Sequence, residues 1–328
     1  MSDFKWVAKE PGAIDSLEIE KFDIERPGPN EIQVKNHAVG VNYIDTYVTT
    51  GAYNIDPYPL TPGVEGAGII TNIGSEITDF SIGDRIGYGG PPLGAYSTIR
   101  NMWPGYAVKI PDGVTHKIAA SIMTKGLTVF YLLNKTFKVN ARNIILFHAA
   151  AGGVGQIFSQ WAKSIGCKLI GTVGSDEKVD IAKKNGCDFI INYRKEDFDK
   201  KVLEITENKG VDVVYDGVGK DTFEKSINCL KVRGMMVSFG NSSGSLNLID
   251  VKKYIVPKSL FFTRPTLGHY FPNKELLGEA AEQLFKQVKY GKVKIEIFKK
   301  YKLEEVVQAH KDFEARKIIG PAILMPNE

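Results

Sequence analysis

Short apolar runs alternate with helical patterns through the second half of this 328-residue chain. The alternation begins at Asn143, where "NIILFH" precedes a glycine-rich loop and a helical pattern that continues through Ser164. Five further apolar runs continue it: "CKLIGTV", "CDFIINY", "VDVVYD", "GMMVSFG" and "SLFFTR". Strands that alternate with helices are typical of a parallel sheet covered on both faces. The sequence therefore predicts an α/β fold with a doubly wound, Rossmann-type parallel sheet.

The first third of the chain has a different pattern. "EIQVKNHAVGVN" alternates apolar and polar residues like a half-buried strand, and "VEGAGIITNIG" and "GDRIGYGG" are short runs bounded by glycine. A chain of this length predicts two domains, the first of them rich in β-strands. Residues 273–290 form an amphipathic helical pattern near the C-terminus. The segment after Pro265 is too small to fold alone, so we expect it to pack on the N-terminal domain.

The loop after "NIILF" reads "HAAAGGVG" and resembles a dinucleotide-binding fingerprint. Ala150, Gly152 and Gly155 occupy the three positions at which that fingerprint has glycine. Gly152 would let the backbone approach a pyrophosphate, and Gly155 would let the helix pack closely on the strand. The alternative is a tight turn that binds nothing, but the strand, loop and helix context favours a nucleotide.

The end of the next strand distinguishes NADP from NAD. An acidic residue there would hydrogen-bond the ribose hydroxyls of NAD, but "LIGTV" is followed by Gly174. Ser175 and Lys178 come next, and Tyr193 follows the third strand. A missing acid with a lysine and a tyrosine nearby favours a 2'-phosphate, hence NADP, although Lys178 could also be a solvated helix lysine.

Composition excludes several other classes of protein. The net charge is only +4, and the densest basic stretch, "KVKIEIFKKYK" at 292–302, alternates like a solvated strand. A nucleic acid is therefore not expected as the main partner. No apolar run approaches the ~18 residues of a membrane span, and the N-terminus has no apolar signal core. The three cysteines are scattered without zinc-ligand or redox spacing, which suits a reducing compartment, so we expect a cytoplasmic protein.

Nine motifs together resemble one known family over nearly the whole chain: "GVNYIDTY", "GVEGAGII", "KGLTVFYLL", "HAAAGGVG", "GTVGSDEK", "INYR", "VVYDGVG", "SFGNSSG" and "TRPTL". The family is the zinc-free NADPH:quinone oxidoreductases, the zeta-crystallin-like branch of the medium-chain dehydrogenase/reductase superfamily. The resemblance implies a split, GroES-like catalytic domain over 1–124 and 266–328 and an NADP-binding Rossmann domain over 125–265. It also implies a cleft between the domains, NADPH as hydride donor, a quinone or other small electrophilic acceptor, and a homodimer joined through the cofactor domains.

The same resemblance implies a set of cofactor-binding residues. Lys178 and Tyr193, with Gly174 and Ser175 nearby, would bind the adenosine phosphate, and the pyrophosphate would lie at the glycine loop. The full set is Asn42, Asp45, Thr128, Gly152, Gly153, Val154, Gly174, Ser175, Lys178, Tyr193, Phe239, Gly240, Asn241, Ser242, Thr263, Arg264 and Arg316. Gly217 stands where some relatives have a serine, so one hydroxyl contact to the cofactor is expected to be absent.

The metal ligands of zinc-dependent members are replaced here. Asn42 stands where those members have a cysteine and Val64 where they have a histidine, and the chain has no four-cysteine cluster. We therefore expect no metal and little alcohol oxidation, which needs a Lewis acid. Asn42, Tyr47 and Tyr53 are the candidates to orient the acceptor oxygen.

Two other functions stay open at this point. The first is NADPH-dependent reduction of an alkenal or enone double bond, which needs the same hydride and a similar apolar slot. The second is a nucleotide- or RNA-binding role without main catalytic function, which the near-neutral charge and the nucleotide loop disfavour.

Overall fold

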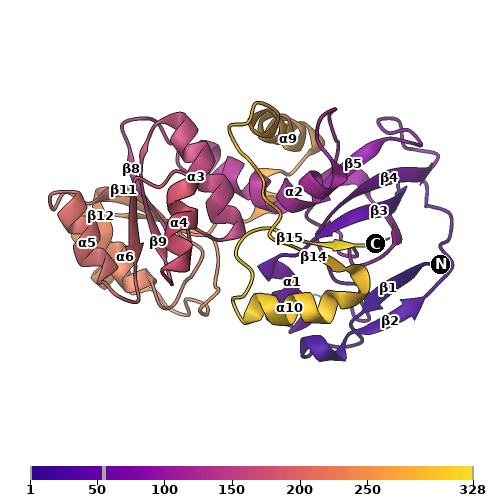
Figure 1. Cartoon of the computed structure of the whole chain (residues 1–328), viewed down its shortest axis with the longest axis horizontal. Helices are drawn as coiled ribbons and strands as arrows, with labels where there is room; N and C mark the ends of the chain where they lie inside the picture. The colour runs from indigo at the N-terminus through magenta and orange to yellow at the C-terminus, as the bar shows by residue number, and fades with distance from the viewer. Residues whose placement is uncertain (1, 54–56, 327–328) are drawn as a thin grey trace. The chain divides into compact units, whose positions relative to one another are not determined.

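The computed structural model describes residues 2–53 and 57–326, and the chain divides into two compact units (Figure 1). The first unit comprises Met1–Leu127, Phe271–Lys289 and Ile295–Glu328, and the second comprises Thr128–Tyr270 and Tyr290–Lys294. The first unit thus contains both ends of the chain. Helix α2 (His116–Tyr131) contains the first division between the units.

The second unit is built on a six-stranded parallel sheet with the order β10-β9-β8-β11-β12-β13. Its strands are β8 (Ile144–Phe147), β9 (Lys168–Val173), β10 (Phe189–Asn192), β11 (Val211–Asp216), β12 (Leu230–Ser238) and β13 (Phe261–Thr263). The strands are almost continuously apolar because a parallel sheet is buried on both faces. The predicted Rossmann-type sheet is confirmed, with all six apolar runs forming strands.

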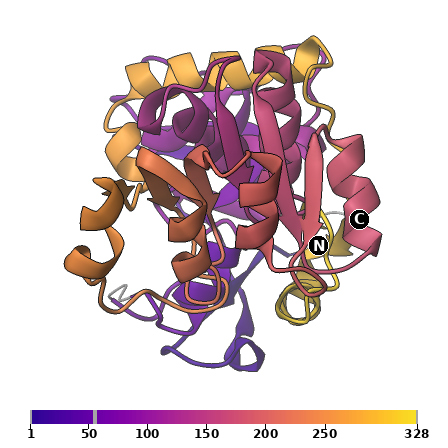
Figure 2. The ribbon, with the colours of Figure 1, turned by 90° about the vertical axis from the view of Figure 1, so that its left-hand side faces the viewer.

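Helices cover this sheet on both sides (Figure 2). The helices of the unit are α3 (Gly153–Ile165), α4 (Glu177–Lys184), α5 (Phe198–Ile205), α6 (Phe223–Cys229), α7 (Val251–Tyr254) and α8 (Leu267–Tyr270), with a π-helical turn, η3 (Leu132–Thr136), directly after α2. Helix α3 packs beside α4, and α5 beside α6. The core between helices and sheet includes Leu146, Ile170, Val214 and Met236. Gly166 ends α3 with a φ of 87°, a left-handed conformation that glycine adopts without strain.

The first unit contains a seven-stranded sheet with the order β14-β15-β3-β4-β5-β7, in which β6 also pairs with β3. All neighbours are antiparallel except β14 and β15. Its strands are β3 (Ile32–Gly40), β4 (Glu65–Ile73), β5 (Arg85–Gly89), β6 (Ile99–Met102), β7 (Ala107–Lys109), β14 (Lys299–Lys302) and β15 (Ala322–Met325), and β1 (Phe4–Val7) pairs separately with β2 (Glu18–Lys21). The alternating pattern of β3 places Ile32 and Val34 in the core of this unit.

Helices of the first unit are α1 (Tyr43–Thr49), α9 (Lys274–Lys289) and α10 (Val306–Glu314), besides α2. Short 3₁₀ turns in the chain are η1 (Ile14–Ser16), η2 (Pro104–Tyr106), η4 (Val256–Lys258) and η5 (Leu303–Glu305). The predicted amphipathic helix is α9, which buries Leu277, Ala280 and Leu284.

One expected strand is shorter than its pattern. Of residues 292–302, only Lys299–Lys302 form a strand, and the prediction for the preceding residues is wrong. Phe298 donates one backbone hydrogen bond to the carbonyl of Pro321 (2.8 Å), and the pairing with β15 begins at Lys299. Alternation alone cannot form a strand where no partner strand is in register.

The helices bear on the sequence-based expectation for a membrane span, and the cysteines bear on that for disulfides. No helix among residues 2–53 and 57–326 is long and apolar enough to cross a membrane. Cys167, Cys187 and Cys229 are all unpaired and buried in the second unit.

Candidate functional site

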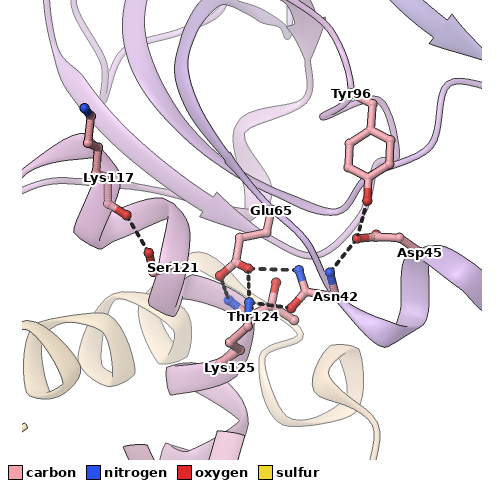
Figure 3. A network of polar contacts seen from close by, with 8 residues as sticks. All are labelled: Asn42, Asp45, Glu65, Tyr96, Lys117, Ser121, Thr124 and Lys125. Atoms are coloured by element: carbon pink, nitrogen blue, oxygen red, sulfur yellow. Dashed lines mark hydrogen bonds and ion pairs between the residues drawn. The ribbon is translucent and has the colours of Figure 1, made fainter. Parts of the chain in front are cut away.

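A buried carboxylate, Glu65, lies at the centre of a polar network in the first unit (Figure 3). Its Oε2 accepts hydrogen bonds from Asn42 Nδ2 (2.9 Å) and Lys125 Nζ (2.9 Å). Its Oε1 accepts one from the backbone N–H of Thr124 (2.7 Å). Glu65 begins β4, Asn42 precedes α1, and Lys125 lies on α2, so three separate elements supply the network.

The ion pair at this centre is almost closed to solvent, since the side chains of Lys125 and Glu65 are 6% and 0% exposed. Burying two charges is favourable only when each is well paired and hydrogen-bonded. Removing one partner of such a pair costs roughly 3–5 kcal/mol, because the other charge stays buried without compensation. The folded state is therefore expected to tolerate the loss of both charged groups better than the loss of one.

The Asn42 side-chain amide has a defined orientation. Lys125 Nζ can only donate, so the atom facing it at 2.8 Å is the amide oxygen Oδ1. The ionised Glu65 carboxylate can only accept, so the atom facing it is the amide nitrogen Nδ2. Asn42 is also the N-cap residue of α1, and its backbone N–H donates to Asp45 Oδ2 (2.8 Å).

Asp45 connects Asn42 to a second buried group of side chains. The Tyr96 hydroxyl donates to Asp45 Oδ2 (2.9 Å) and lies 2.7 Å from His310 Nε2. Asp45 Oδ1 and His310 Nδ1 are buried without a hydrogen-bond partner among the described residues. Burial raises the pKa of Asp45 to about 7, despite the Asn42 N–H, the Tyr96 hydroxyl and the charge of Lys125, which all lower it. Burial also lowers the pKa of His310 to about 4, so this imidazole is neutral at pH 7.

Sequence reasoning missed most of this network. The sequence predicts no role for Glu65 or for Lys125. The only signal for Lys125 is its position: it is the one charged residue in the apolar stretch Ile118–Leu133. A single charge in an apolar helix calls for a buried partner.

Of the other predicted residues of the first unit, Tyr47 and Tyr53 lie at α1, whereas Arg316 follows α10. Tyr47, on α1, and Tyr53, just after it, contact each other edge to face with ring centroids 5.3 Å apart. Tyr53 also donates its backbone N–H to the carbonyl of Tyr47 (3.1 Å). Arg316 follows α10, is exposed, and has a positive φ of 58°.

In the second unit, nearly all predicted residues follow the carboxyl ends of parallel strands. They lie after β8 (Gly152, Gly153, Val154), β9 (Gly174, Ser175, Lys178), β10 (Tyr193) and β12 (Phe239, Gly240, Asn241, Ser242), and at the end of β13 (Thr263, Arg264). Thr128 is the exception, since it lies on α2. Open α/β sheets bind ligands at this edge, so the sheet brings most of the set to one place.

The N-terminus of α3 has the features of a phosphate site. Gly152 is its N-cap, with no side-chain hydrogen bond to the helix and no acidic residue in the first turn. The first backbone N–H groups of a helix have no partner within the helix and carry partial positive charge. An alanine Cβ at Gly155 would lie 2.5 Å from the carbonyl oxygen of Ala149, so only glycine permits this packing of loop on helix.

Gly174 and Tyr193 are in direct contact. A Cβ at Gly174 would lie 2.5 Å from the Tyr193 hydroxyl oxygen, so the tyrosine covers the space that glycine leaves. Lys178 follows on the first turn of α4 and is half-buried. Asp176, which lies between Gly174 and Lys178 in the sequence, forms an ion pair with Lys195 (2.5 Å) and accepts a hydrogen bond from Asn192 (2.9 Å). Both interactions lower the pKa of Asp176.

The loop after β12 is held by hydrogen bonds to its neighbours. Arg264 Nη1 donates to the carbonyl of Ser238 (2.8 Å), and Nη2 donates to the Asn241 amide oxygen (3.2 Å) in the orientation that satisfies both amide atoms. Phe239 and Ser242 donate their backbone N–H groups to the carbonyls of Asp216 and Gly217. A Cβ at Gly217 would lie 3.0 Å from the Phe239 ring, so the absent side chain makes room for that ring.

Comparison with known proteins identifies the family. The chain is 43% identical over 315 residues to a quinone oxidoreductase of Pseudomonas aeruginosa, covering 96% of this chain and 97% of the relative. The chain belongs to the quinone oxidoreductases. The solved structure of the Escherichia coli quinone oxidoreductase complexed with NADPH superposes on 98% of this chain and 100% of its own, with a TM-score of 0.96 and 42% identity. A 2-haloacrylate reductase of a Burkholderia species is 40% identical over 98% of both chains.

Two broader family descriptions also match this quinone oxidoreductase sequence. Residues 28–112 match the alcohol dehydrogenase GroES-like domain, and residues 153–285 match the zinc-binding dehydrogenase family. Among residues 2–53 and 57–326, no group of three or more His, Cys, Asp or Glu side chains could hold a metal ion. The polar groups that meet at Asn42 are its own amide, the Glu65 carboxylate and the Lys125 ammonium group. The ammonium group already pairs with an oxygen of the carboxylate.

Proposed function

We propose that this chain catalyses the NADPH-dependent reduction of quinones. The observation that carries the proposal is the 43% identity to a quinone oxidoreductase across nearly the full length of both chains. The NADPH bound by the Escherichia coli relative supports NADPH as the cofactor. The absence of an acidic residue at Gly174, and the lysine and tyrosine beside it, support the same choice.

The second unit offers residues that fit NADPH. The backbone N–H groups of Gly152, Gly153 and Val154 would bind the pyrophosphate at the N-terminus of α3. Lys178 and Tyr193, with Gly174 and Ser175, would bind the 2'-phosphate. The nicotinamide end would contact Thr128, Phe239, Gly240, Asn241 and Ser242, and also Asn42 from the first unit. Thr263, Arg264 and Arg316 would line the remaining site, and Asp45 would orient its neighbours or contact the cofactor. When bound, NADPH supplies a hydride, and the protein positions the two reactants.

The residues of the first unit would act on the acceptor. We assign Asn42, Tyr47 and Tyr53 to orient the quinone oxygen, because each side chain carries a hydrogen-bond donor and all three lie at or next to α1. A donor aimed at that oxygen stabilises the negative charge that develops there during reduction.

A panel of acceptors tests the assignment. With NADPH, the protein is expected to reduce ortho- and para-quinones, and with NADP⁺ it is expected to oxidise simple alcohols hardly at all. The similarity to a 2-haloacrylate reductase favours reduction of an activated carbon–carbon double bond as the second candidate, so haloacrylate and enones belong in the panel. Turnover of alcohols without turnover of quinones would contradict the proposal, and turnover of haloacrylate alone would favour the second candidate.

Replacing Lys178 with alanine is expected to weaken NADPH binding about tenfold and to leave NADH binding almost unchanged. A charge-assisted hydrogen bond to the 2'-phosphate contributes roughly 1.5–3 kcal/mol, and NADH offers no such phosphate. Lys178 is half-buried, so solvent screening favours the lower end of that range. Tyr193→Phe removes a neutral donor and is expected to have a smaller effect of the same kind. Fluorescence titration with each nucleotide measures both.

Lys183 provides the matched control, because it is an exposed lysine near the other end of α4. Lys183→Ala is expected to bind both nucleotides as the unmodified protein does. Equal changes in NADPH and NADH affinity for Lys178→Ala would remove Lys178 from the phosphate site.

We also propose that the chain forms a homodimer through its second unit. Strand β13 is the last strand of the parallel sheet, and Phe261 and the nearby Val256 are exposed apolar residues. An unpaired strand edge with exposed apolar residues is a template for pairing with another chain. Sedimentation equilibrium is expected to give twice the mass of one chain, with Phe261→Lys shifting the population to monomer; a monomeric unmodified protein at micromolar concentration would rule the dimer out.

The cytoplasm is the proposed compartment. Three unpaired cysteines, all buried, favour a reducing environment. The small net charge of +4 gives no support to a nucleic acid as the main partner.

A further inference from the structure

We propose that Lys125, a buried cation, is a positioning residue that holds the side-chain amide of Asn42 in the orientation needed for reaction. This inference rests on the proposed reduction of a quinone or enone carbonyl with NADPH. The role of Lys125 is distinct from direct contact with substrate, since it acts through the amide of Asn42.

The first argument is the geometry of the amide. Asn42 Oδ1 accepts from Lys125 (2.8 Å) and Asn42 Nδ2 donates to Glu65 (2.9 Å), so both ends of the amide are held. A primary amide has two N–H bonds, and the bond to Glu65 uses one of them. The direction of the second N–H therefore follows from Lys125 and Glu65, because rotating the amide by half a turn would set a donor against the ammonium and an acceptor against the carboxylate.

The second argument is electrostatic. An ammonium that donates to the amide oxygen draws electron density from the amide and makes the remaining N–H a stronger donor. Lys125 and Glu65 compensate each other's charge, so this polarisation adds no net charge to the buried network. Lys125 has three N–H bonds, and two of them have partners among the described residues.

The third argument is that Asn42 does more than complete the hydrogen bonding of the buried ion pair. Glu65 has a further donor in the backbone of Thr124 (2.7 Å), and Lys125 reaches its carboxylate directly (2.9 Å). Asn42 adds an amide that bridges both charges at the first residue of the segment that carries Tyr47 and Tyr53. The bridge links the buried charges to the residues proposed to meet the acceptor.

The test uses a charge-balanced pair of substitutions, because Lys125→Met alone leaves Glu65 buried and unpaired. In Lys125→Met/Glu65→Gln no buried charge remains at the centre, so the protein is expected to fold with a thermal midpoint close to that of the unmodified protein. Its kcat for quinone is expected to fall roughly tenfold to hundredfold, as for other small misplacements of a reacting group. Lys274→Met/Asp79→Asn is the matched control, since it removes another lysine–carboxylate ion pair (2.7 Å) at an exposed position of the same unit.

A double-mutant cycle separates positioning from mere stability. Asn42→Ala is expected to lower kcat in the unmodified protein and to have little further effect in Lys125→Met/Glu65→Gln, because the amide is no longer held there. An equal loss in both backgrounds would overturn the proposal, and so would an unchanged kcat in Lys125→Met/Glu65→Gln.

A spectroscopic readout works without cofactor or turnover. In protein labelled with ¹⁵N-asparagine, the Asn42 side-chain signals are identified by their loss in Asn42→Ala. They are expected to shift and to exchange faster with water in Lys125→Met/Glu65→Gln, and to stay unchanged in Lys274→Met/Asp79→Asn. Unchanged Asn42 signals in the first variant would refute the positioning role. If the unmodified protein reduces none of the acceptors, the proposed function fails while this measurement still decides whether Lys125 holds the amide.

Discussion

Replacing Gly40 with alanine is expected to destabilise the protein by about 3 kcal/mol or more and to abolish quinone reduction. Gly40 ends β3, and an added Cβ would lie 2.2 Å from Glu65 Oε2 and 2.3 Å from the carbonyl oxygen of Ala120. The first of these atoms belongs to the buried network and the second to the backbone of α2, so neither can move away cheaply. The substitution would displace Glu65 from Asn42 and Lys125 together.

Gly278 is the matched control for this substitution. It lies within α9 of the same unit, and an added Cβ would meet nothing within 4 Å. Gly278→Ala is therefore expected to stabilise the protein by about 0.5–1 kcal/mol through helix propensity. Denaturant unfolding measures both. A Gly40→Ala protein as stable and as active as the unmodified one would show that β3 and α2 are not packed as described.

Substitutions in the glycine loop are expected to separate stability from cofactor binding. Gly155→Ala would bring a Cβ within 2.5 Å and 2.6 Å of the carbonyl oxygens of Ala149 and Ala150, so it is expected to cost about 1–3 kcal/mol or more. Gly152→Ala meets only the Ala149 oxygen, at 3.2 Å, and its φ of −73° suits alanine. Its stability should stay near that of the unmodified protein.

NADPH titration completes this comparison. Gly152→Ala is expected to bind NADPH at least about tenfold more weakly, because the added methyl group blocks the close approach of the pyrophosphate. If Gly152→Ala bound NADPH normally, the pyrophosphate would not lie at this loop. If Gly155→Ala were as stable as the unmodified protein, the loop would pack less tightly on α3 than the distances from Gly155 to the carbonyl oxygens of Ala149 and Ala150 indicate.

The parallel sheet could be predicted because its strands are buried on both faces. Most of the strands are short, mainly apolar runs, such as "IILF" in β8, and each is separated from the next by a helical pattern or a glycine. The sequence of helix α2, "HKIAASIMTKGLTVFY", predicts a helix less clearly, because it is apolar on most sides. The prediction of a strand before Lys299 is wrong for the opposite reason: the alternation is clear, but among residues 2–53 and 57–326 the pairing with β15 begins only at Lys299.

The network around Glu65 could not be predicted from spacing. Asn42 and Glu65 are 23 residues apart and Lys125 is 60 residues beyond Glu65, and they meet because β3, β4 and α2 pack together. His310 comes from still further along the chain, 214 residues after Tyr96. Gly174 and Tyr193 are predictable from the sequence, because each follows the end of a strand and those two strands are neighbours in the sheet.

The burial of all three thiols has a consequence for a protein that handles quinones. Quinones and enones are electrophiles that add covalently to thiolates, so an accessible thiolate would be alkylated by the acceptor itself. Burial raises the pKa of Cys167 and of Cys187 to about 11 and raises the pKa of Cys229 well above its usual range. At neutral pH the three cysteines therefore stay in the thiol form, and their sulfur atoms are covered. Burial is therefore expected to protect the three cysteines from alkylation by the acceptor.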